Sequence, residues 1–340
     1  MARSRRFARK RATLALLGVA LAAAALAALC LGRYPVPAGD VARIIFGLMT
    51  GTGEQGGVEW NTVVNTRLPR VAAAMLIGMA LSEAGAAYQG IFKNPMVSPD
   101  LLGVSAGACV GAALGILLGL GGVGIQVSAF ACAVASVVLA VLIPRLFRDD
   151  SILMLVLAGI VVSGLMSSVL GLLKFLADPD SQLADIVFWT MGSLNGVGAD
   201  ELAACAPVIV VCAALIAMLR WRINVLALPD DQARYLGTRV TRLRVAIIAC
   251  ATLMTASAVC LSGTIGWIGL VVPHMARMVV GRDNRFVIPA SMLVGALFLL
   301  VADTLSRTLS SMSIPISVIT GIVGAPLFVV LLAAGRGRGR

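Results

Sequence analysis

Long apolar stretches alternate with short polar ones along most of this chain. Ten of them approach the roughly 20 residues that a helix needs to cross a bilayer: residues 12–32, 68–90, 101–121, 124–144, 152–175, 202–220, 244–262, 264–280, 286–304 and 314–334. In lipid, such a segment satisfies its backbone hydrogen bonds by forming a helix. The pattern therefore predicts an all-α polytopic membrane protein with about ten transmembrane helices.

The composition agrees with this prediction. Of the 340 residues, 59% are hydrophobic and 13% are charged, which excludes a soluble globular domain and a disordered chain. The first thirty residues resemble a secretory signal, but residues 14–31 are long enough to span and no A-x-A cleavage site follows them. We interpret them as the first span. The seven cysteines lack C-x-x-C spacing and are interpreted as small apolar side chains, and no metal site is predicted.

The distribution of basic residues predicts the orientation. Both chain ends are strongly basic, and an even number of spans places both on one side, which the positive-inside rule makes the cytoplasm. Six basic residues then lie outside: Arg33, Arg43, Arg67, Arg70, Lys174 and Arg307. The other 21 of the 27 Lys and Arg residues lie inside. The net charge of +11 is thus assigned to topology and anionic lipid rather than to nucleic acid, because no basic run is interleaved with stacking aromatics.

Segments outside the spans divide the chain. Residues 1–11 and 335–340 form basic cytoplasmic tails around a membrane domain at 12–334. Residues 33–66 form an outer segment with a short amphipathic piece. Residues 186–198 are apolar but too short to cross, which indicates a re-entrant or interfacial half-helix. Residues 221–243 form the longest inner loop, and residues 281–285 a tight inner turn.

Small residues recur every four positions in three predicted helices. The third has Gly103, Gly107, Gly111, Gly115 and Gly119; the fifth has Gly159, Ser163, Ser167 and Gly171; the tenth has Ser317, Gly321 and Ala325. A face without side chains lets a neighbouring backbone approach closely. We expect packing within one subunit for the third helix. The fifth and tenth suit either such packing or a wide pathway and subunit interface.

Ionisable residues at membrane depth are costly and usually functional. The candidates are Glu83, Asp100, Lys174, His274 and Asp303. Asp100, Lys174 and Asp303 lie near predicted helix ends, so only Glu83 and His274 need a specific explanation. A membrane protease is disfavoured because no G-x-S-x-G elbow is present. A secondary, ion-coupled transporter stays open as an alternative on the basis of Glu83.

A series of motifs, in order along the chain, resembles a known family. They are RLPR at 67–70, Gly78, Leu81, Gly85 and Gln89, KNPMVSPDLLGVSAGA at 93–108, WTMGSL at 189–194, LPDDQARYLG at 228–237, GTIGWIGLVVPHMAR at 263–277, Asp303 with Arg307, and IPISVITGIVGAPLF at 314–328. This series is similar to the FecCD-type permeases of binding-protein-dependent ATP-binding-cassette (ABC) importers. The motif positions that we single out are Asn94, Pro95, Pro99, Gly103, Pro273, His274 and Asp303.

The resemblance implies a multi-pass permease of the cell (inner) membrane that imports an iron chelate such as a ferric siderophore, haem or cobalamin. It further implies a second permease subunit, identical or not, two ATP-binding subunits and an extracytoplasmic substrate-binding protein. No P-loop is possible in this chain, because its three lysines follow Arg9, Phe92 and Leu173 rather than Gly. We therefore expect no enzymatic activity and no bound cofactor in this chain, with ATP used by the partner subunit.

The resemblance also assigns roles to residues. Arg67, Arg70 and Arg307 are expected to receive acidic side chains of the binding protein; the alternative is anchoring to lipid phosphate, with an Asp303–Arg307 helix pair. The inner loop is expected to form a short helix that couples to the ATPase, through Asp230, Asp231, Ala233, Leu236 and Gly237, rather than an ordinary solvated loop. The translocation pathway or dimer interface is assigned to Gly159, Ser163, Ser167, Gly171, Ser317 and Gly321. Glu83, Ser313 and Ser317 depart from the family pattern, which leaves the identity of the chelate open.

Overall fold

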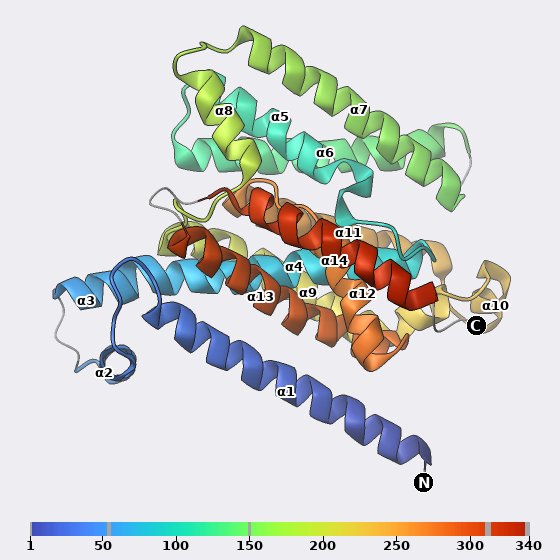
Figure 1. Ribbon diagram of the computed structural model, residues 1–340. Helices are drawn as coiled ribbons and strands as arrows, with labels where there is room; N and C mark the ends of the chain where they lie inside the picture. The colour runs from blue at the N-terminus through green and yellow to red at the C-terminus, as the bar shows by residue number, and fades with distance from the viewer. Residues whose placement is uncertain (1, 53–55, 149–150, 310–313, 337–340) are drawn as a thin grey trace.

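The structure is a computed structural model that describes residues 2–52, 56–148, 151–309 and 314–336. Its described residues form helices and no strand. The helices are α1 (Ala2–Cys30), α2 (Ala38–Thr50), α3 (Val58–Trp60), a π-helical segment (Asn61–Arg67), α4 (Leu68–Ile91), a 3₁₀ turn (Pro99–Leu102), α5 (Val104–Leu117), α6 (Gly122–Leu146), α7 (Ile152–Leu176), α8 (Gln182–Met191), α9 (Ala199–Leu226), α10 (Asp230–Tyr235), α11 (Val240–Ser262), α12 (Ile268–Val280), α13 (Asn284–Thr308) and α14 (Ile316–Arg336). Figure 1 shows the long helices running broadly in one direction, with α2 seen end on and α8 inclined to them.

Each of the ten predicted apolar stretches contains one helix. Among the described residues, seven helical segments are long and apolar enough to cross a membrane, and α5, α12 and α14 are shorter apolar helices. α5 has 14 residues and α12 has 13, so each is only about 20 Å long, less than the hydrocarbon core. Hydropathy did not reveal this shortening, because the irregular segments that precede both helices are also apolar.

Two boundaries differ from the sequence prediction. α9 continues to Leu226 and α11 begins at Val240, so the inner loop is 227–239 rather than 221–243. The N-terminal basic residues are helical, because α1 already begins at Ala2. Phe7 of this segment stacks edge-on against Phe286 at 5.4 Å, and Lys10 lies 4.9 Å from the same ring. Of the C-terminal tail, residues 337–340 lie outside the described residues.

α4 forms the centre of the bundle. In its most apolar window 78% of the residues are buried, against 17% for α1 and for α7. The glycines of the sequence motif explain this position: a Cβ at Gly78 would collide with the carbonyl of Gly295 on α13, and one at Gly85 with that of Gly269 on α12. Without side chains at these points, three helices meet backbone to backbone.

Helices α5, α6, α7 and α8 lie together on one side of this centre, and α1 runs along the opposite side (Figure 1). The glycine face of α5 packs on α6, because Cβ atoms at Gly107, Gly111 and Gly115 would collide with Ser136, Ser128 and Ile125 or their neighbours. Packing within one subunit is therefore confirmed for these three glycines of the third predicted helix. Gly103 instead begins α5 at φ +82° and Gly119 follows it at φ +65°.

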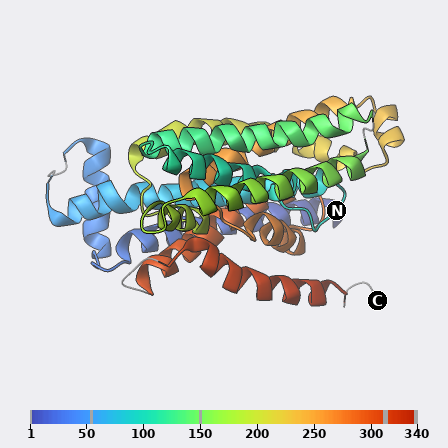
Figure 2. The same cartoon turned by 90° about the horizontal axis from the view of Figure 1, so that it is seen from above.

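The two ends of the bundle differ. The start of α1, the last turns of α14 and α10 lie at one end (Figures 1 and 2), which we call the inner end, following the predicted orientation. α2, α3 and α8 lie at the other, outer end. α2 is the amphipathic piece expected from residues 33–66, and α8 is the short helix expected from 186–198, although it begins earlier, at Gln182.

Candidate functional site

The outer end contains a cavity of about 780 Å³, which we call the outer cavity. Its lining comes from the segment after α1, the start of α4, the segment after α8 and the flanks of α13 and α14. The lining residues are Gly32, Arg33, Tyr34, Thr62, Thr66, Arg67, Arg70, Phe188, Gly192, Ser193, Asn195, Arg307 and Pro315. Among these described residues four are arginines and none is acidic, so the cavity attracts anions.

Arg67 is held inward by backbone carbonyls. Its Nη1 donates to the carbonyl oxygens of Leu29 at 2.7 Å and Cys30 at 3.1 Å, and its Nη2 donates to that of Tyr34. The residue is only 5% exposed. Carbonyl oxygens satisfy the guanidinium hydrogens but do not neutralise its charge. Arg67 therefore fixes the segment after α1 and still contributes positive potential to the outer cavity.

Arg70 and Arg307 share one buried carboxylate, that of Asp303. Arg70 Nε and Nη2 each lie 2.9 Å from Asp303 Oδ1, whereas Arg307 Nε lies 3.8 Å from Oδ2. Arg70 also donates to Asn195 at 2.5 Å, and Arg307 to the carbonyl of Ala28. The principal partner of Asp303 is thus Arg70, and not Arg307 as its spacing predicted. Asp303 is fully buried rather than at the interface.

These contacts bear on the docking role expected for Arg67, Arg70 and Arg307. The structure brings them together on one cavity, but their guanidinium groups already hold partners within the chain. Arg33, which the sequence analysis did not assign to docking, is the exposed arginine among the lining residues. The feature of the sequence that could have identified Arg33 is its position among the few basic residues of the outer side.

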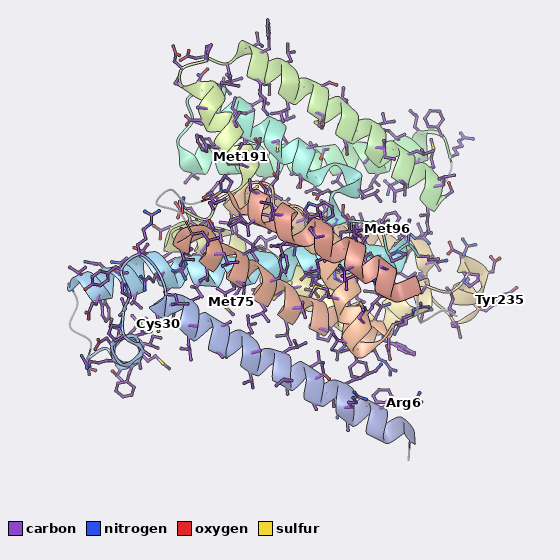
Figure 3. The ribbon with its side chains drawn as sticks, in the orientation of Figure 1. Arg6, Cys30, Met75, Met96, Met191 and Tyr235 are labelled. Carbon is purple, nitrogen blue, oxygen red and sulfur yellow. The ribbon has the colours of Figure 1, made fainter. Side chains whose placement is uncertain are left out.

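The short helix expected in the inner loop is present at the inner end. α10 follows Pro229, and Gly237 ends the segment at φ +74°, where its N–H donates to the Arg234 carbonyl at 2.9 Å. A left-handed φ of this kind favours glycine. Tyr235 is 90% exposed and projects from the end of the molecule (Figure 3), and Leu236 is 65% exposed.

Ala233 does not fit its expected role. Its side chain is fully buried against the rest of the chain, because it lies on the opposite side of this short helix from the exposed residues. It therefore anchors α10 and cannot contact an ATPase, a correction to the sequence prediction. Asp231 is exposed, as a contact residue needs to be.

The carboxylate of Asp230 attaches α10 to neighbouring segments of the bundle. It pairs with Lys93 at 3.2 Å and with Arg244 at 3.2 Å. Partial burial acts to raise the pKa of Asp230, but the hydrogen bonds and charges of these two cations outweigh it and hold the pKa below its usual range. The first turn of α10 is thus tied both to the loop after α4 and to α11.

The small-residue face of α7 divides into two halves. Gly159 is buried against the backbone of Leu101, and Ser163 lies beside Gly103. Ser167 and Gly171 are exposed, and nothing lies within 4 Å of a Cβ placed on Gly171. The inner half of this face therefore packs within the chain, and only its outer half is open to a pathway or a second subunit.

The corresponding face of α14 packs partly on the segment before α12. Ser317 Oγ donates to the carbonyl of Met191 at 2.5 Å. Gly321 lies near the indole of Trp267, and Gly324, which the sequence analysis did not single out, packs directly on it. Trp267 has φ +72°. Ser313 lies outside the described residues.

A second polar cavity, of about 540 Å³, lies at the inner end, and we call it the inner cavity. It is lined by Gln89, Gly90, Lys93, Asn94, Pro95, Ala227, His274, Arg277, Met278, Arg282 and Asn284. The motif residues Asn94, Pro95 and His274 meet here. Two other motif residues serve packing: Pro99 lies against Gly269, and Pro273 is buried within α12.

Glu83 keeps its unusual character in the structure. It is fully buried in α4, and neither carboxyl oxygen has a hydrogen-bond partner among the described residues. Glu83 does not line any of the described cavities.

Comparisons with known proteins agree with this architecture. The profile of the FecCD transport family matches residues 19–334. The chain is 36% identical over 308 residues to the molybdate import system permease protein MolB of Haemophilus influenzae, covering 91% of both chains. It is 39% identical over 275 residues to a probable iron chelatin transport system permease protein of Helicobacter pylori, covering 81% of this chain and 83% of that protein. A structure described as an inward-facing, metal-chelate type ABC transporter matches with a TM-score of 0.86 at 34% identity, over 95% of this chain and 99% of that one.

Proposed function

Because this chain belongs to the FecCD transport family, and is thus a multi-pass inner-membrane permease subunit of an ABC importer, we propose that its cargo is a metal chelate. The class comprises ferric siderophores, haem and cobalamin. The observation that carries the proposal is the likeness to a metal-chelate type transporter over nearly the whole chain. The molybdate permease among the relatives makes an oxyanion the alternative to test.

Uptake by the reconstituted importer tests the cargo. The permease, assembled with its ATP-binding subunits and its substrate-binding protein, is placed in liposomes and offered a ferric siderophore, haem, cobalamin and molybdate in parallel. ATP-dependent accumulation of one of the three chelates is the expected result. Accumulation of molybdate alone would refute the proposed cargo while leaving the importer class intact.

The outer cavity is the proposed docking site for the binding protein. Its arginines offer positive charge without an acidic lining residue, and a guanidinium binds a carboxylate by two parallel hydrogen bonds. Rim charges mainly affect association rate and salt dependence. We therefore expect Arg33→Glu to weaken binding-protein association, most strongly at low salt.

A matched substitution controls for general charge effects. Arg43 also lies on the outer side, in α2, with its side chain 82% exposed, but it does not line the cavity. Arg43→Glu should leave association nearly unchanged. Equal loss in both variants, or none in Arg33→Glu, would remove the cavity as the docking site.

The open half of α7 is the proposed contact with the pathway and the second permease subunit. Small and hydroxyl-bearing residues leave room for a large chelate and bind it weakly. In a background without the seven native cysteines, Ser167→Cys should cross-link between subunits or react with thiol reagents. Ser136→Cys, fully buried between α5 and α6, is the control that should do neither. An inert Ser167→Cys would place this face inside one subunit.

A further inference from the structure

The inner cavity gathers positive charge from three separate chain segments. Lys93 follows α4, Arg277 lies on α12, and Arg282 lies in the turn before α13. None of the described lining residues is acidic, and the amides of Asn94 and Asn284 and the imidazole of His274 complete its polar wall.

Two carboxylates outside the lining, those of Asp230 and Asp283, already have partners. Asp230 divides its charge between Lys93 and Arg244, which does not line the cavity. Asp283 pairs with Arg285 at 2.7 Å and accepts from Asn224 at 2.8 Å. Lys93 is thus partly compensated, whereas neither Arg277 nor Arg282 forms an ion pair within 4.0 Å among the described residues.

Arg277 is positioned rather than neutralised. Its Nη1 donates to Gln89 Oε1 at 2.5 Å. Gln89 is itself oriented, because its Nε2 donates to the carbonyls of Val97 at 3.1 Å and Leu270 at 3.3 Å. The charge that acts most strongly on Arg277 is a second cation, Arg282. Both guanidinium groups line the same cavity, so an anion bound there lowers the repulsion between them.

We infer that the inner cavity binds an oxyanion group, either the phosphate of an anionic lipid headgroup or a free oxyanion from the cytoplasm. Guanidinium pairs hold phosphate oxygens by charge-assisted hydrogen bonds, and basic pockets between transmembrane helices on the cytoplasmic side suit lipid headgroups. A volume of about 540 Å³ admits either ligand. The inference does not depend on which cargo is imported.

The site also borders the coupling segment. Lys93 both lines the cavity and pairs with Asp230 in the first turn of α10. A bound oxyanion therefore shares a cation with the helix that is expected to contact the ATPase.

Thermal unfolding of the full-length chain in nanodiscs tests the site, followed by tryptophan fluorescence. One arm adds inorganic phosphate to phosphatidylcholine nanodiscs at constant ionic strength, and the other replaces part of that lipid with phosphatidylglycerol. The unfolding midpoint should rise in at least one arm. A rise with phosphate identifies a free oxyanion, and a rise with phosphatidylglycerol alone identifies the headgroup.

Three variants assign the effect to the cavity. Arg282→Gln removes an exposed cation, and Arg277→Gln removes the cation that Gln89 holds in place. In each variant, the apparent affinity that the rise of the unfolding midpoint reports should fall at least about tenfold. Arg242→Gln removes the same charge from an exposed position on α11 outside the cavity and should respond as the wild type does. No rise in either arm, or a wild-type response in Arg282→Gln, would overturn the inference. Because Arg282 is exposed, its variant remains informative even if Arg277→Gln fails to fold.

Discussion

The buried ion pair between Arg70 and Asp303 provides the most demanding test of how the outer cavity is built. Replacing Asp303 by Asn preserves the shape of the side chain and removes its charge. Arg70, whose Nε and Nη2 lie 2.9 Å from the carboxylate, would then be left without a counter-ion. Arg307, at 3.8 Å from the same group, would lose its compensation as well.

The burial of the pair sets the magnitude. The side chain of Asp303 is 0% exposed and that of Arg70 is 12% exposed. Removing one partner of a buried pair costs about 3–5 kcal/mol, and the remaining amide oxygen still accepts a hydrogen bond, so we expect about 3 kcal/mol. The exposed pair of Arg43 and Asp40, with side chains 82% and 25% exposed, should contribute only about 0–1 kcal/mol.

The assay compares free energies of unfolding in mixed micelles, with denaturing detergent as the variable and tryptophan fluorescence as the signal. Asp303→Asn is measured beside Asp40→Asn, which removes the same charge at the same end of the bundle. A difference of about 2–3 kcal/mol between the two variants is expected. If Asp303→Asn destabilised the chain no more than Asp40→Asn, the buried ion pair would not be what holds the cavity wall together.

Three further predictions concern the inner end and the centre. Leu236→Ser should reduce transport per ATP hydrolysed by at least about tenfold. It should not lower the free energy of unfolding, because Leu236 is 65% exposed. Parallel uptake and ATPase assays measure this ratio, and an unchanged ratio would contradict the prediction. Gly85→Ala should lower the free energy of unfolding by at least about 3 kcal/mol, because its Cβ would overpack against the Gly269 carbonyl. Gly164→Ala, with open space around its Cβ, should be neutral or stabilising. Equal effects of the two variants in thermal unfolding would disprove the backbone contact. Partial burial opposes ionisation of Asp283, but bonds from Arg285 and Asn224 lower its pKa to about 2 from 3.8. The ionised carboxylate therefore stabilises the fold above pH 4, and the free energy of unfolding should fall by about 2 kcal/mol between pH 4 and pH 2. Asp283→Asn should not show this loss when unfolding is measured as a function of pH.

The sequence could predict the coupling segment, because its signals are local. Pro229, the acidic residues after it and Gly237 specify the start and end of a short helix whatever surrounds it. Which side of that helix faces the bundle is not a local property. Ala233 was therefore misassigned, since only the tertiary structure shows that its side chain is buried.

The apolar stretches determined that the chain is a helical membrane protein, because lipid imposes the same length requirement on every span. The basic ends predict its orientation. The motif glycines indicated close helix contacts. Only the tertiary structure decided which helices meet: Arg70 finds Asp303 across 233 residues of sequence, although Arg307 is four residues away. The inner cavity likewise combines residues from 89 to 284. Spacing along one helix fixes which residues share a face, whereas contacts between distant helices depend on the packing of the whole bundle. In this chain both charged cavities are formed by that packing.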